Sequence, residues 1–392
     1  MNDPQRINRI QTLIDQLHKG ITSTENEKRK VNWDSFAGLP GIFVRHLPQK
    51  GGNKIPFIAD LDREMWAAVL EADLREVYGD PLCYLEFELR RKLFAFQNFL
   101  DDNPLTDRVT MWFGVGFCES VLGIPQEPAQ ATQEPWVGKN RLIGDPIDLD
   151  SLEVPDFMIN ERARFAREWY ERLKSAAGED VEIVFPEWDF GPLGIATHVR
   201  GTEDFVIDCI EDGDFVHDLM SFLYEAKVSW SKGRAAHLGC QPQTLYLAND
   251  DVNVPLISPE VYRYFVFPYE QKISRYHGGI DYWHSCGRID PLLGDVQQLP
   301  GLKMVHISPW TNLEKAVEIA HPDLVLEVVL HPIDEVLKAT PEQMTGKLEW
   351  IRNVCQDRLY TVRADAFQVY TTLEQDLEKV WTWIERCRAL FG

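Results

Sequence analysis

The stretch Gly279-Ile-Asp-Tyr-Trp-His-Ser-Cys-Gly-Arg288 joins a short apolar run to a polar turn, and units of this kind recur along the chain. Such runs are predicted strands, because they are short, rich in β-branched and aromatic residues, and bounded by turn residues. They fall at Arg108–Phe113, Val181–Phe185, Thr244–Ala248, Gly279–His284, Leu302–Ile307, Leu324–Leu330 and Leu359–Val362.

Helical patterns separate most of these runs. They cover Asn160–Ala177, Phe215–His237, Pro259–His277, Leu313–Ala320 and Pro341–Cys355, and a last amphipathic helix carries Leu373, Leu377, Val380, Trp381 and Ile384 on one face. Alternation of strand and helix at this spacing predicts an α/β fold with a parallel sheet. Seven strands are visible and an eighth would close a (β/α)8 TIM-type barrel, so we predict that barrel. A doubly wound open sheet is the alternative, but the fingerprint G-x-G-x-x-G that would favour it is absent.

The N-terminal third is predicted to be largely helical. Apolar residues repeat at helical spacing in two series, which are Ile10, Leu13, Ile14 and Leu17, and Leu61, Met65, Trp66, Val69, Leu70 and Leu74. The segment 38–52 is rich in Gly and Pro and predicts a loop, and 126–155 predicts a long excursion over the surface or above an active site. We therefore expect residues 1–105 to form a helical extension packed on a barrel of residues 106–392.

Composition narrows the possible partners. The chain has 392 residues, 44% of them hydrophobic, and a net charge of −22 from 40 basic and 62 acidic residues. An acidic surface repels phosphate backbones and anionic lipids, so neither nucleic acid nor a membrane is an expected partner. The sequence shows no apolar leader and no stretch long enough to span a bilayer, which predicts a cytoplasmic protein. Seven widely spaced cysteines, an odd number, predict reduced thiols.

His284 and Cys286 form the first candidate for a metal site. An imidazole and a thiol two residues apart on an extended backbone project to the same side, where they can share a soft metal ion such as zinc. The same residues can instead be structural, a hydrogen-bonded histidine at a strand end and a buried cysteine. A lone H-x-C lacks the second ligand pair that makes a zinc signature strong.

Carboxylates follow two of the predicted strands, where the carboxyl ends of barrel strands hold active-site groups. Glu187 and Asp189 come after the second run, and each is either an acid, base or ligand in the cavity or, for Asp189, a cap for the next turn. Asp250 and Asp251 come after the third run. Adjacent extended residues face opposite ways, so one is expected to enter the cavity while the other caps or is solvated.

Two further pairs end later strands. His306 and Ser308 lie on one strand face and are expected to point inward, although an imidazole and a hydroxyl bonded to a neighbouring strand have the same sequence signature. Arg363 and Asp365 end the series. An arginine at a barrel mouth is a natural clamp for a carboxylate or phosphate, and a structural Arg/Asp pair would look identical in sequence.

Three segments carry a family resemblance. They are Phe190–Phe205, which begins Phe-Gly-Pro-Leu-Gly, the strand end Asp250-Asp251 with Ile257–Pro268, and Trp283-His-Ser-Cys-Gly287. As a set they resemble the uroporphyrinogen decarboxylase superfamily, which includes the decarboxylase itself and the corrinoid-linked methyltransferases. The resemblance covers roughly residues 60–390 and implies a (β/α)8 barrel with its site at the strand carboxyl ends.

The resemblance is closer to the methyltransferase branch. The decarboxylase carries an N-terminal motif, P-x-W-x-M-R-Q-A-G-R, that grips the carboxylates of the tetrapyrrole, whereas the comparable region here has only the scattered Arg45. The methyltransferases hold zinc with H-x-C and a distant cysteine near the last strand. His284 and Cys286 match the first two ligands, but Leu359–Phe367 contains no cysteine. Either Asp365, His306 or a carboxylate at 250 or 251 completes the site, or the metal is absent and Cys286 is structural.

The leading hypothesis is a methyltransferase-type enzyme that moves a methyl group between a small methylated compound and a corrinoid protein or a thiol, with zinc as the Lewis acid. The residues assigned to it are His284 and Cys286 for the metal, Asp250, Asp251 and Glu187 for catalysis, and Arg363, Asp365, His306 and Trp188 for substrate binding. One alternative is a metal-free decarboxylase of a pyrrolic or aromatic carboxylic acid that uses Asp250 or Asp251. Another is a non-catalytic protein that carries a corrinoid or a small ligand.

Overall fold

The computed structural model describes residues 4–35, 45–52 and 54–392. Its centre is a parallel six-stranded sheet with the order β3-β10-β9-β8-β7-β6, and β4 and β5 form a second parallel pair. The strands of these sheets are β3 (Phe57–Leu61), β4 (Arg108–Thr110), β5 (Glu182–Val184), β6 (Leu245–Ala248), β7 (Ile280–His284), β8 (Met304–Ile307), β9 (Val325–Leu330) and β10 (Tyr360–Phe367). A separate antiparallel pair joins β1 (Trp33–Ser35) to β2 (Leu47–Pro48).

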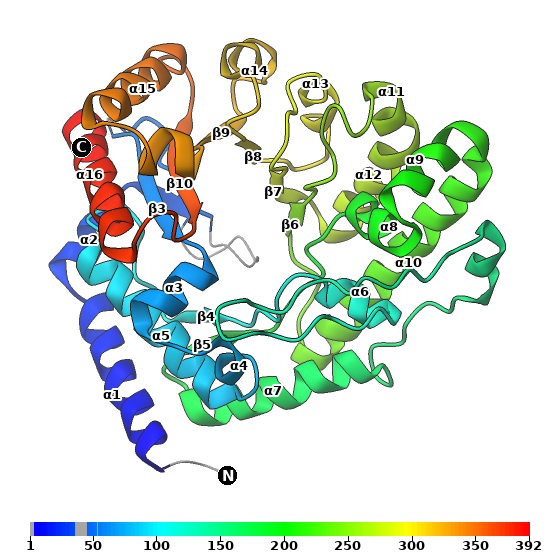
Figure 1. Cartoon of the computed structure of the whole chain (residues 1–392), viewed down its shortest axis with the longest axis horizontal. Coiled ribbons are helices and arrows are strands. Elements are labelled where there is room, and N and C mark those ends of the chain that lie inside the picture. The colour runs from blue at the N-terminus through cyan, green and yellow to red at the C-terminus, as the bar shows by residue number, and fades with distance from the viewer. Residues whose placement is uncertain (1–3, 36–44, 53) are drawn as a thin grey trace.

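The parallel strands curl around a common centre (Figure 1). A parallel bridge between Phe190 and Ala248 connects the segment after β5 to β6. Between β3 and β4 no ladder of backbone hydrogen bonds forms in the described part of the chain, and we call this gap the β3–β4 seam. The α/β class and the parallel sheet predicted from the sequence are confirmed as this curled half-barrel.

The edge of β3 that faces the seam is hydrogen-bonded by side chains. The backbone N–H of Phe57 donates to the carboxylate of Asp102 at 3.1 Å, and that of Ala59 donates to Asp101 at 3.0 Å. Each carboxylate takes the place that a neighbouring strand would have, so these two N–H groups of the β3 edge are satisfied without β4.

All seven strands predicted from the sequence are confirmed, and the eighth is β3. It pairs with β10 in parallel, with Phe57 opposite Val362 and Ala59 opposite Ala364. The periodicity of the sequence predicts a helix from Leu61 onward, but Leu61 is the last residue of β3 and the helix α3 begins at Arg63. The sheet therefore takes one strand from the first 105 residues, and their separation as a distinct extension stays a prediction.

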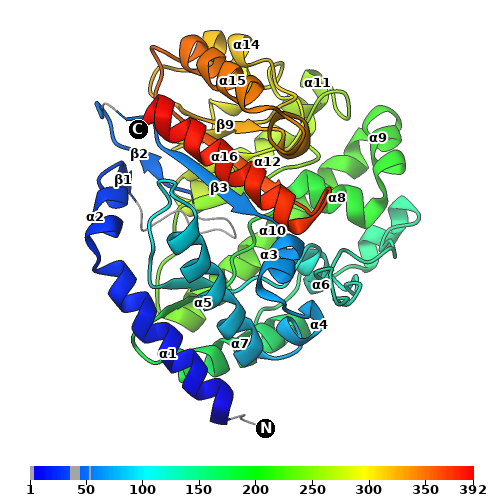
Figure 2. The same ribbon diagram turned by 60° about the vertical axis from the view of Figure 1, so that its left-hand side comes forward.

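Helices pack around the outside of the sheet (Figures 1 and 2). Before β4 they are α1 (Pro4–Ile21), α2 (Thr24–Lys30), α3 (Arg63–Leu70), α4 (Leu74–Val77) and α5 (Pro81–Asn98). Between β4 and β6 they are α6 (Phe117–Leu122), α7 (Glu161–Ala177), α8 (Pro192–Arg200), α9 (Thr202–Glu211) and α10 (Gly213–Leu238), with a 3-10 turn at Pro146–Ser151. After β6 they are α11 (Pro259–Val261), α12 (Phe267–His277), α13 (Leu293–Val296), α14 (Leu313–Ile319), α15 (Pro341–Val354) and α16 (Leu373–Phe391), with π-helical turns at Tyr262–Val266 and Pro332–Leu337. Among the described helices, none combines the length and the apolar character needed to cross a bilayer.

Helix α16 covers β3 from outside (Figure 2). Its Trp383 is fully buried and meets the ring of Phe57 edge-on, with the ring centroids 6.2 Å apart. The N-terminal helix α1 packs along α5 through its buried residues Ile10, Ile14 and Leu17. The two ends of the chain are thus joined through one hydrophobic core on this side of the sheet.

A bulge near the end of β10 changes the direction of the strand. The register between β10 and β3 shifts between Ala364 and Phe367, and Ala366 adopts a left-handed backbone with φ of 56°. A bulge of this kind bends the strand and re-aims the side chain next to it. Here that side chain is Asp365, which lies 3.3 Å from Arg45.

Phe57→Ala is expected to lower the free energy of unfolding by about 3–5 kcal/mol, because it removes a buried ring from the contact between β3 and α16. Urea denaturation followed by circular dichroism measures the change. Ile210→Ala is the control, since Ile210 is 82% exposed and its truncation should change stability by no more than about 0.5 kcal/mol. Equal losses in the two variants would contradict the burial of Phe57 beneath α16.

Candidate active site

A cleft of about 500 Å³ opens where strands β6 to β10 end. The carboxyl ends of parallel strands meet at one edge of a sheet, so the residues that follow them lie close together. The polar residues gathered there are Asp250 after β6, His284 and Cys286 at the end of β7, His306 of β8, and Arg363 and Asp365 of β10. Aromatic side chains complete this part of the lining, which are Trp136, Phe190, Tyr246 and Trp310.

Asp250, His284 and Cys286 form a compact cluster, here called the Asp–His–Cys group. Nε2 of His284 lies 3.1 Å from Sγ of Cys286 and 3.1 Å from Oδ1 of Asp250. The backbone N–H of Cys286 donates to the same carboxylate oxygen over 3.3 Å. The ligand atoms of the three side chains all lie within 4.8 Å of one another. Because carboxylate, imidazole and thiolate are all zinc ligands, this group can hold a metal ion.

The protonation states within the Asp–His–Cys group depend on one another. Burial alone would raise the pKa of Asp250, but the neighbouring His284 lowers it far below the usual range. Burial alone would lower the pKa of His284, but Tyr246, Cys286 and Asp250 raise it well above the usual range. Burial also raises the pKa of the Cys286 thiol. Metal binding at this group would therefore release protons from His284 and Cys286, which makes metal affinity pH-dependent.

His306 packs on His284, with ring centroids 4.2 Å apart and planes 36° apart. Its Nδ1 lies 2.6 Å from the carbonyl oxygen of Ser285, which fixes the ring through the neighbouring turn. Burial and the charge of His284 lower the pKa of His306 to about 3, so its imidazole is neutral. Ser308 instead donates to the carbonyl of Gly287 at 2.6 Å and is not among the described residues that line the cleft. The predicted inward pair is therefore split, because only His306 faces the cleft.

A buried ion network lies beside the Asp–His–Cys group. Glu327 of β9 accepts hydrogen bonds from Arg45 at 2.9 Å and from Arg363 at 2.8 Å, and the hydroxyl of Tyr282 also donates to it. Asp365 lies 3.3 Å from Arg45 and 3.9 Å from Arg363. Burial alone would raise the pKa of Glu327, but the two arginines lower it to about 2. The network holds both guanidinium groups at the wall of the cleft.

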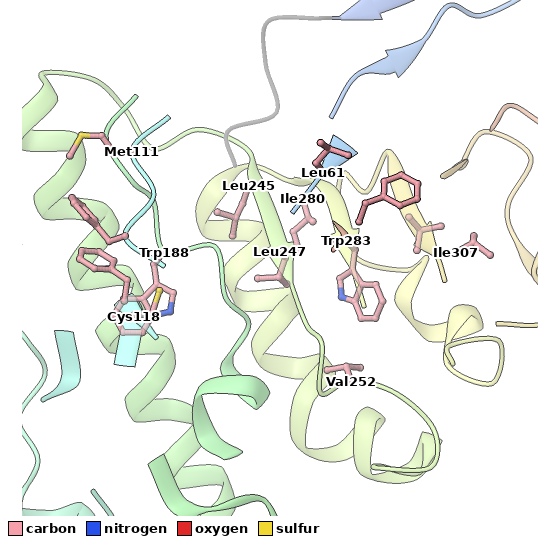
Figure 3. Packing of buried hydrophobic residues seen from close by; sticks show 14 of the residues in the cluster. Leu61, Met111, Cys118, Trp188, Leu245, Leu247, Val252, Ile280, Trp283 and Ile307 are labelled. Carbon is pink, nitrogen blue, oxygen red and sulfur yellow. The ribbon is translucent and has the colours of Figure 1, made fainter. Parts of the chain in front are cut away.

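Glu187 and Trp188 lie outside the cleft. Glu187 accepts a hydrogen bond from Ser231 at 2.8 Å and lies 3.5 Å from Arg234, so it is engaged with α10. Trp188 is 2% exposed and packs among buried apolar residues beside Cys118 (Figure 3). The turn after β5 thus directs both side chains towards the helices, and Phe190 is the residue of that turn that reaches the cleft.

Asp251 turns away from Asp250, in agreement with the expectation that the two carboxylates diverge. Its carboxylate accepts a hydrogen bond from Thr197 of α8 at 3.1 Å. His198, the next residue of α8, lies close to Asp251 and is held by Glu119 of α6 at 2.5 Å. Burial raises the pKa of Asp251, and the charge of His198 opposes that effect. One carboxylate therefore enters the cleft, and the other belongs to a separate polar cluster on α6 and α8.

Glu327 and the paired rings of Tyr246 and Tyr282 are site residues that the sequence patterns do not predict. Glu327 is a lone charge inside the otherwise apolar strand β9, and such a residue needs a buried partner, which is the signal that could have found it. The two tyrosines stack on adjacent strands with their centroids 5.0 Å apart. Nothing local in the sequence connects Arg45 to residue 327, so its place in the site is visible only in the folded chain.

Comparison with known proteins identifies the family. The chain belongs to the uroporphyrinogen decarboxylase (URO-D) family, whose sequence profile matches residues 106–358. Two curated relatives, both methylcobamide:CoM methyltransferase MtaA of Methanosarcina barkeri, one from strain Fusaro / DSM 804, are 22% identical over 180 residues, which are 46% of this chain and 49% of each relative. The chain thus spans about half the length of these relatives. A solved methyltransferase from Methanosarcina mazei has the same fold, with a TM-score of 0.62 over 87% of this chain and 95% of its own, at 16% identity. The family predicted from the sequence is confirmed.

Glu327→Gln is expected to lower the free energy of unfolding by about 3–5 kcal/mol at neutral pH, because it leaves two buried guanidinium groups without the carboxylate they share. Denaturant titration measures the loss. Glu349→Gln, which changes an exposed carboxylate on α15, should change stability by no more than about 0.5 kcal/mol.

The difference between wild type and Glu327→Gln should depend on pH. The pKa of Glu327 falls from 4.5 to about 2 on folding, and a lowered folded-state pKa adds stability that is present above the unfolded value. This contribution is lost as the pH falls from about 4.5 to about 2. Denaturant titrations over this range should show the two proteins converging. A stability difference that stays constant down to the acid end would contradict the ion pairing of Glu327.

Proposed function

We propose that this protein is a methyltransferase of the URO-D family that moves a methyl group between a small methylated substrate and a thiol or a corrinoid protein. The observation that carries the proposal is the Asp–His–Cys group, whose ligand atoms lie within 4.8 Å of one another at the carboxyl edge of the sheet. Two relatives, aligned with this chain over about half of their length, are named methylcobamide:CoM methyltransferases. Their names support methyl transfer as the reaction class.

The Asp–His–Cys group has the donor set and spacing of a zinc site. Bond lengths of about 2.0–2.3 Å at tetrahedral angles put two zinc ligand atoms roughly 3.5 Å apart. Nε2 of His284 is 3.1 Å from each of its two neighbours, so small side-chain adjustments suffice. Three protein ligands leave a fourth position for substrate, which is the pattern of catalytic rather than structural zinc.

Asp250 is the third ligand in this proposal. The resemblance implies a cysteine near the end of the last strand, and in this chain that strand end carries Arg363 and Asp365. Both are engaged with the ion network of Glu327 and Arg45, whereas Asp250 already contacts His284. A carboxylate in place of a thiolate keeps the charge of the ligand set and exchanges a soft donor for a harder one.

Zinc bound at this group would lower the pKa of a coordinated thiol and so supply a thiolate nucleophile near neutral pH. The protein's own side chains provide the setting. His306 packs on His284 and fixes the plane of its ring. Arg363 and Asp365 border the same cleft and orient the substrate. Trp136 and Trp310, each more than half exposed at the cleft, offer apolar surface to a methylated substrate or to a corrinoid-carrying partner.

Zinc content tests the ligand set. Wild-type protein loaded with zinc and then dialysed is expected to retain about one ion per chain, and Cys286→Ser and Asp250→Asn are expected to bind it at least about tenfold more weakly. Inductively coupled plasma mass spectrometry and a chelator competition measure both. Cys240→Ser and Asp323→Asn are matched controls away from the cleft and should retain the metal. Full retention by both ligand variants would rule out this site.

Methyl transfer tests the reaction. Zinc-loaded protein is expected to demethylate methylcobalamin in the presence of a small thiol, followed by the change in cobalamin absorbance. Cys286→Ser and Asp250→Asn should reduce the rate about 10- to 100-fold, and Cys240→Ser and Asp323→Asn should not. Metal-independent release of CO₂ from a pyrrolic or aromatic acid, lost in Asp250→Asn, would instead support the decarboxylase alternative.

A further inference from the structure

Side chains hydrogen-bond backbone groups on the β4 edge of the β3–β4 seam, as they do on the β3 edge. The hydroxyl of Tyr84 on α5 donates to the carbonyl of Thr110 and accepts the backbone N–H of Trp112, both over 2.8 Å. The carboxylates of Asp101 and Asp102 do the same for the β3 edge. These side chains occupy backbone groups on both edges that a direct β3–β4 ladder would otherwise use, which weakens the drive for the strands to close.

The cleft continues through the seam to a second region beneath α5, here called the seam lobe. It is lined by Trp66 of α3, by Lys92, Ala95 and Phe96 of α5, and by Leu105 and Thr106 of the segment before β4. Four of these six residues are apolar. The seam lobe therefore combines an apolar surface with the amine of Lys92, next to the paired charges of Arg29, Asp101 and Arg91, in the same cavity as the Asp–His–Cys group.

Among the described residues, Lys92 is the lysine or arginine of the cleft with no carboxylate at ion-pair distance, although Glu88 and Asp107 act on it from further away. Its Nζ donates to Thr106 Oγ1 at 3.1 Å, and no carboxylate of the described residues lies within ion-pair distance. Burial lowers the pKa of Lys92 to about 8, which leaves the amine protonated at neutral pH. Charges that are removed from water are normally paired, so this amine is suited to bind an anion.

The arginines that line the cleft differ from Lys92 in this respect. Arg29 pairs with Asp101, Arg45 and Arg363 pair with Glu327, and Arg63 and Arg91 pair with Glu88. Each of these guanidinium groups has a carboxylate from the protein itself. An incoming anion would have to compete with those carboxylates at an arginine, but at Lys92 it would compete only with a threonine hydroxyl and water.

We propose that the seam lobe binds the anionic end of the substrate, so that the thiol or methylated compound is a small organic acid whose carboxylate pairs with Lys92. Its apolar middle lies against Ala95, Phe96 and Leu105, and its reacting end lies at the Asp–His–Cys group in the same cavity. This inference rests on the proposed function for the reacting end and on the seam lobe alone for the acid.

Matched ligands test the role of Lys92. The probes are mercaptoacetate and its longer-chain homologues, each compared with its neutral primary amide, and isothermal titration calorimetry measures their binding to zinc-loaded protein. Wild type is expected to bind the acid of best-fitting length at least about tenfold more tightly than its amide. Lys92→Met should abolish this preference and keep amide binding, and Lys92→Arg should restore part of it. Lys28→Met, at an exposed site on α2, should leave the preference unchanged.

Stability measurements separate a binding role from a structural one. Removing a half-buried cation that has no carboxylate at ion-pair distance is expected to leave the denaturation midpoint of Lys92→Met unchanged or raised. A lowered midpoint, equal binding of acids and amides by wild type, or an acid preference that survives Lys92→Met would overturn the proposal. Lys92→Gln provides the same comparison where Lys92→Met does not fold.

The experiments distinguish an error in the proposal that Lys92 binds an acid from an error in the proposed methyl transfer. If the protein prefers acids in a way that depends on Lys92 but catalyses no methyl transfer, acid binding in the seam lobe is supported and the proposed reaction is ruled out. If the protein catalyses methyl transfer but binds acids and amides equally, acid binding in the seam lobe is ruled out and the proposed reaction is supported.

Discussion

The carboxylate of Glu327 is the group on which the arrangement of the cleft depends. It is buried between two guanidinium groups and a tyrosine hydroxyl that come from β7, from β10 and from the segment before β2. Three buried charges are tolerated only when their geometry is satisfied, since each one alone would carry a large desolvation penalty. The network therefore fixes the relative positions of strands that are distant in sequence. His284 follows Tyr282 by two residues, so strand alternation places it on the same inner face as the network. The bulge after Ala364 turns Asp365 towards Arg45.

The Asp–His–Cys group follows from the register of two adjacent strands. Ala248 of β6 lies opposite His284 of β7 in the parallel ladder. Asp250 and Cys286 each come two residues after these strand ends, so the register of the two strands brings their side chains together. A ligand set of this kind needs only one strand pair to be in place. A cysteine on the last strand would instead require the correct spacing across β8 and β9, and in this chain that strand end serves the ion network.

The sequence predicted what depends on local pattern. Apolar runs separated by helical repeats predict seven of the strands. The polar residues that follow these runs predict the edge of the sheet at which the cleft opens. Strand β3 was missed because five residues beside a helical repeat carry little periodic signal. The position of Glu187 and Trp188 after a strand predicts that they enter the cavity, but the turn after β5 directs Glu187 to α10 and buries Trp188 beside Cys118. Arg45 could not be assigned, because its partner Glu327 lies 282 residues away and only the folded chain joins them.

At the seam between β3 and β4, the features that would allow a ligand to bind lower the stability of the fold. Carboxylates and a tyrosine hydroxyl replace the strand pairing that would have closed the sheet, which keeps the backbone satisfied but leaves a cavity beneath α5. A cavity with a half-buried amine lowers stability in two ways, through lost packing and through desolvation of charge. An anion that binds there offsets the second cost, and it stabilises the folded chain in proportion to the logarithm of its concentration over its dissociation constant. Ligand binding and folding of this region are then thermodynamically linked, so the seam is the part of the structure whose stability should respond most directly to substrate.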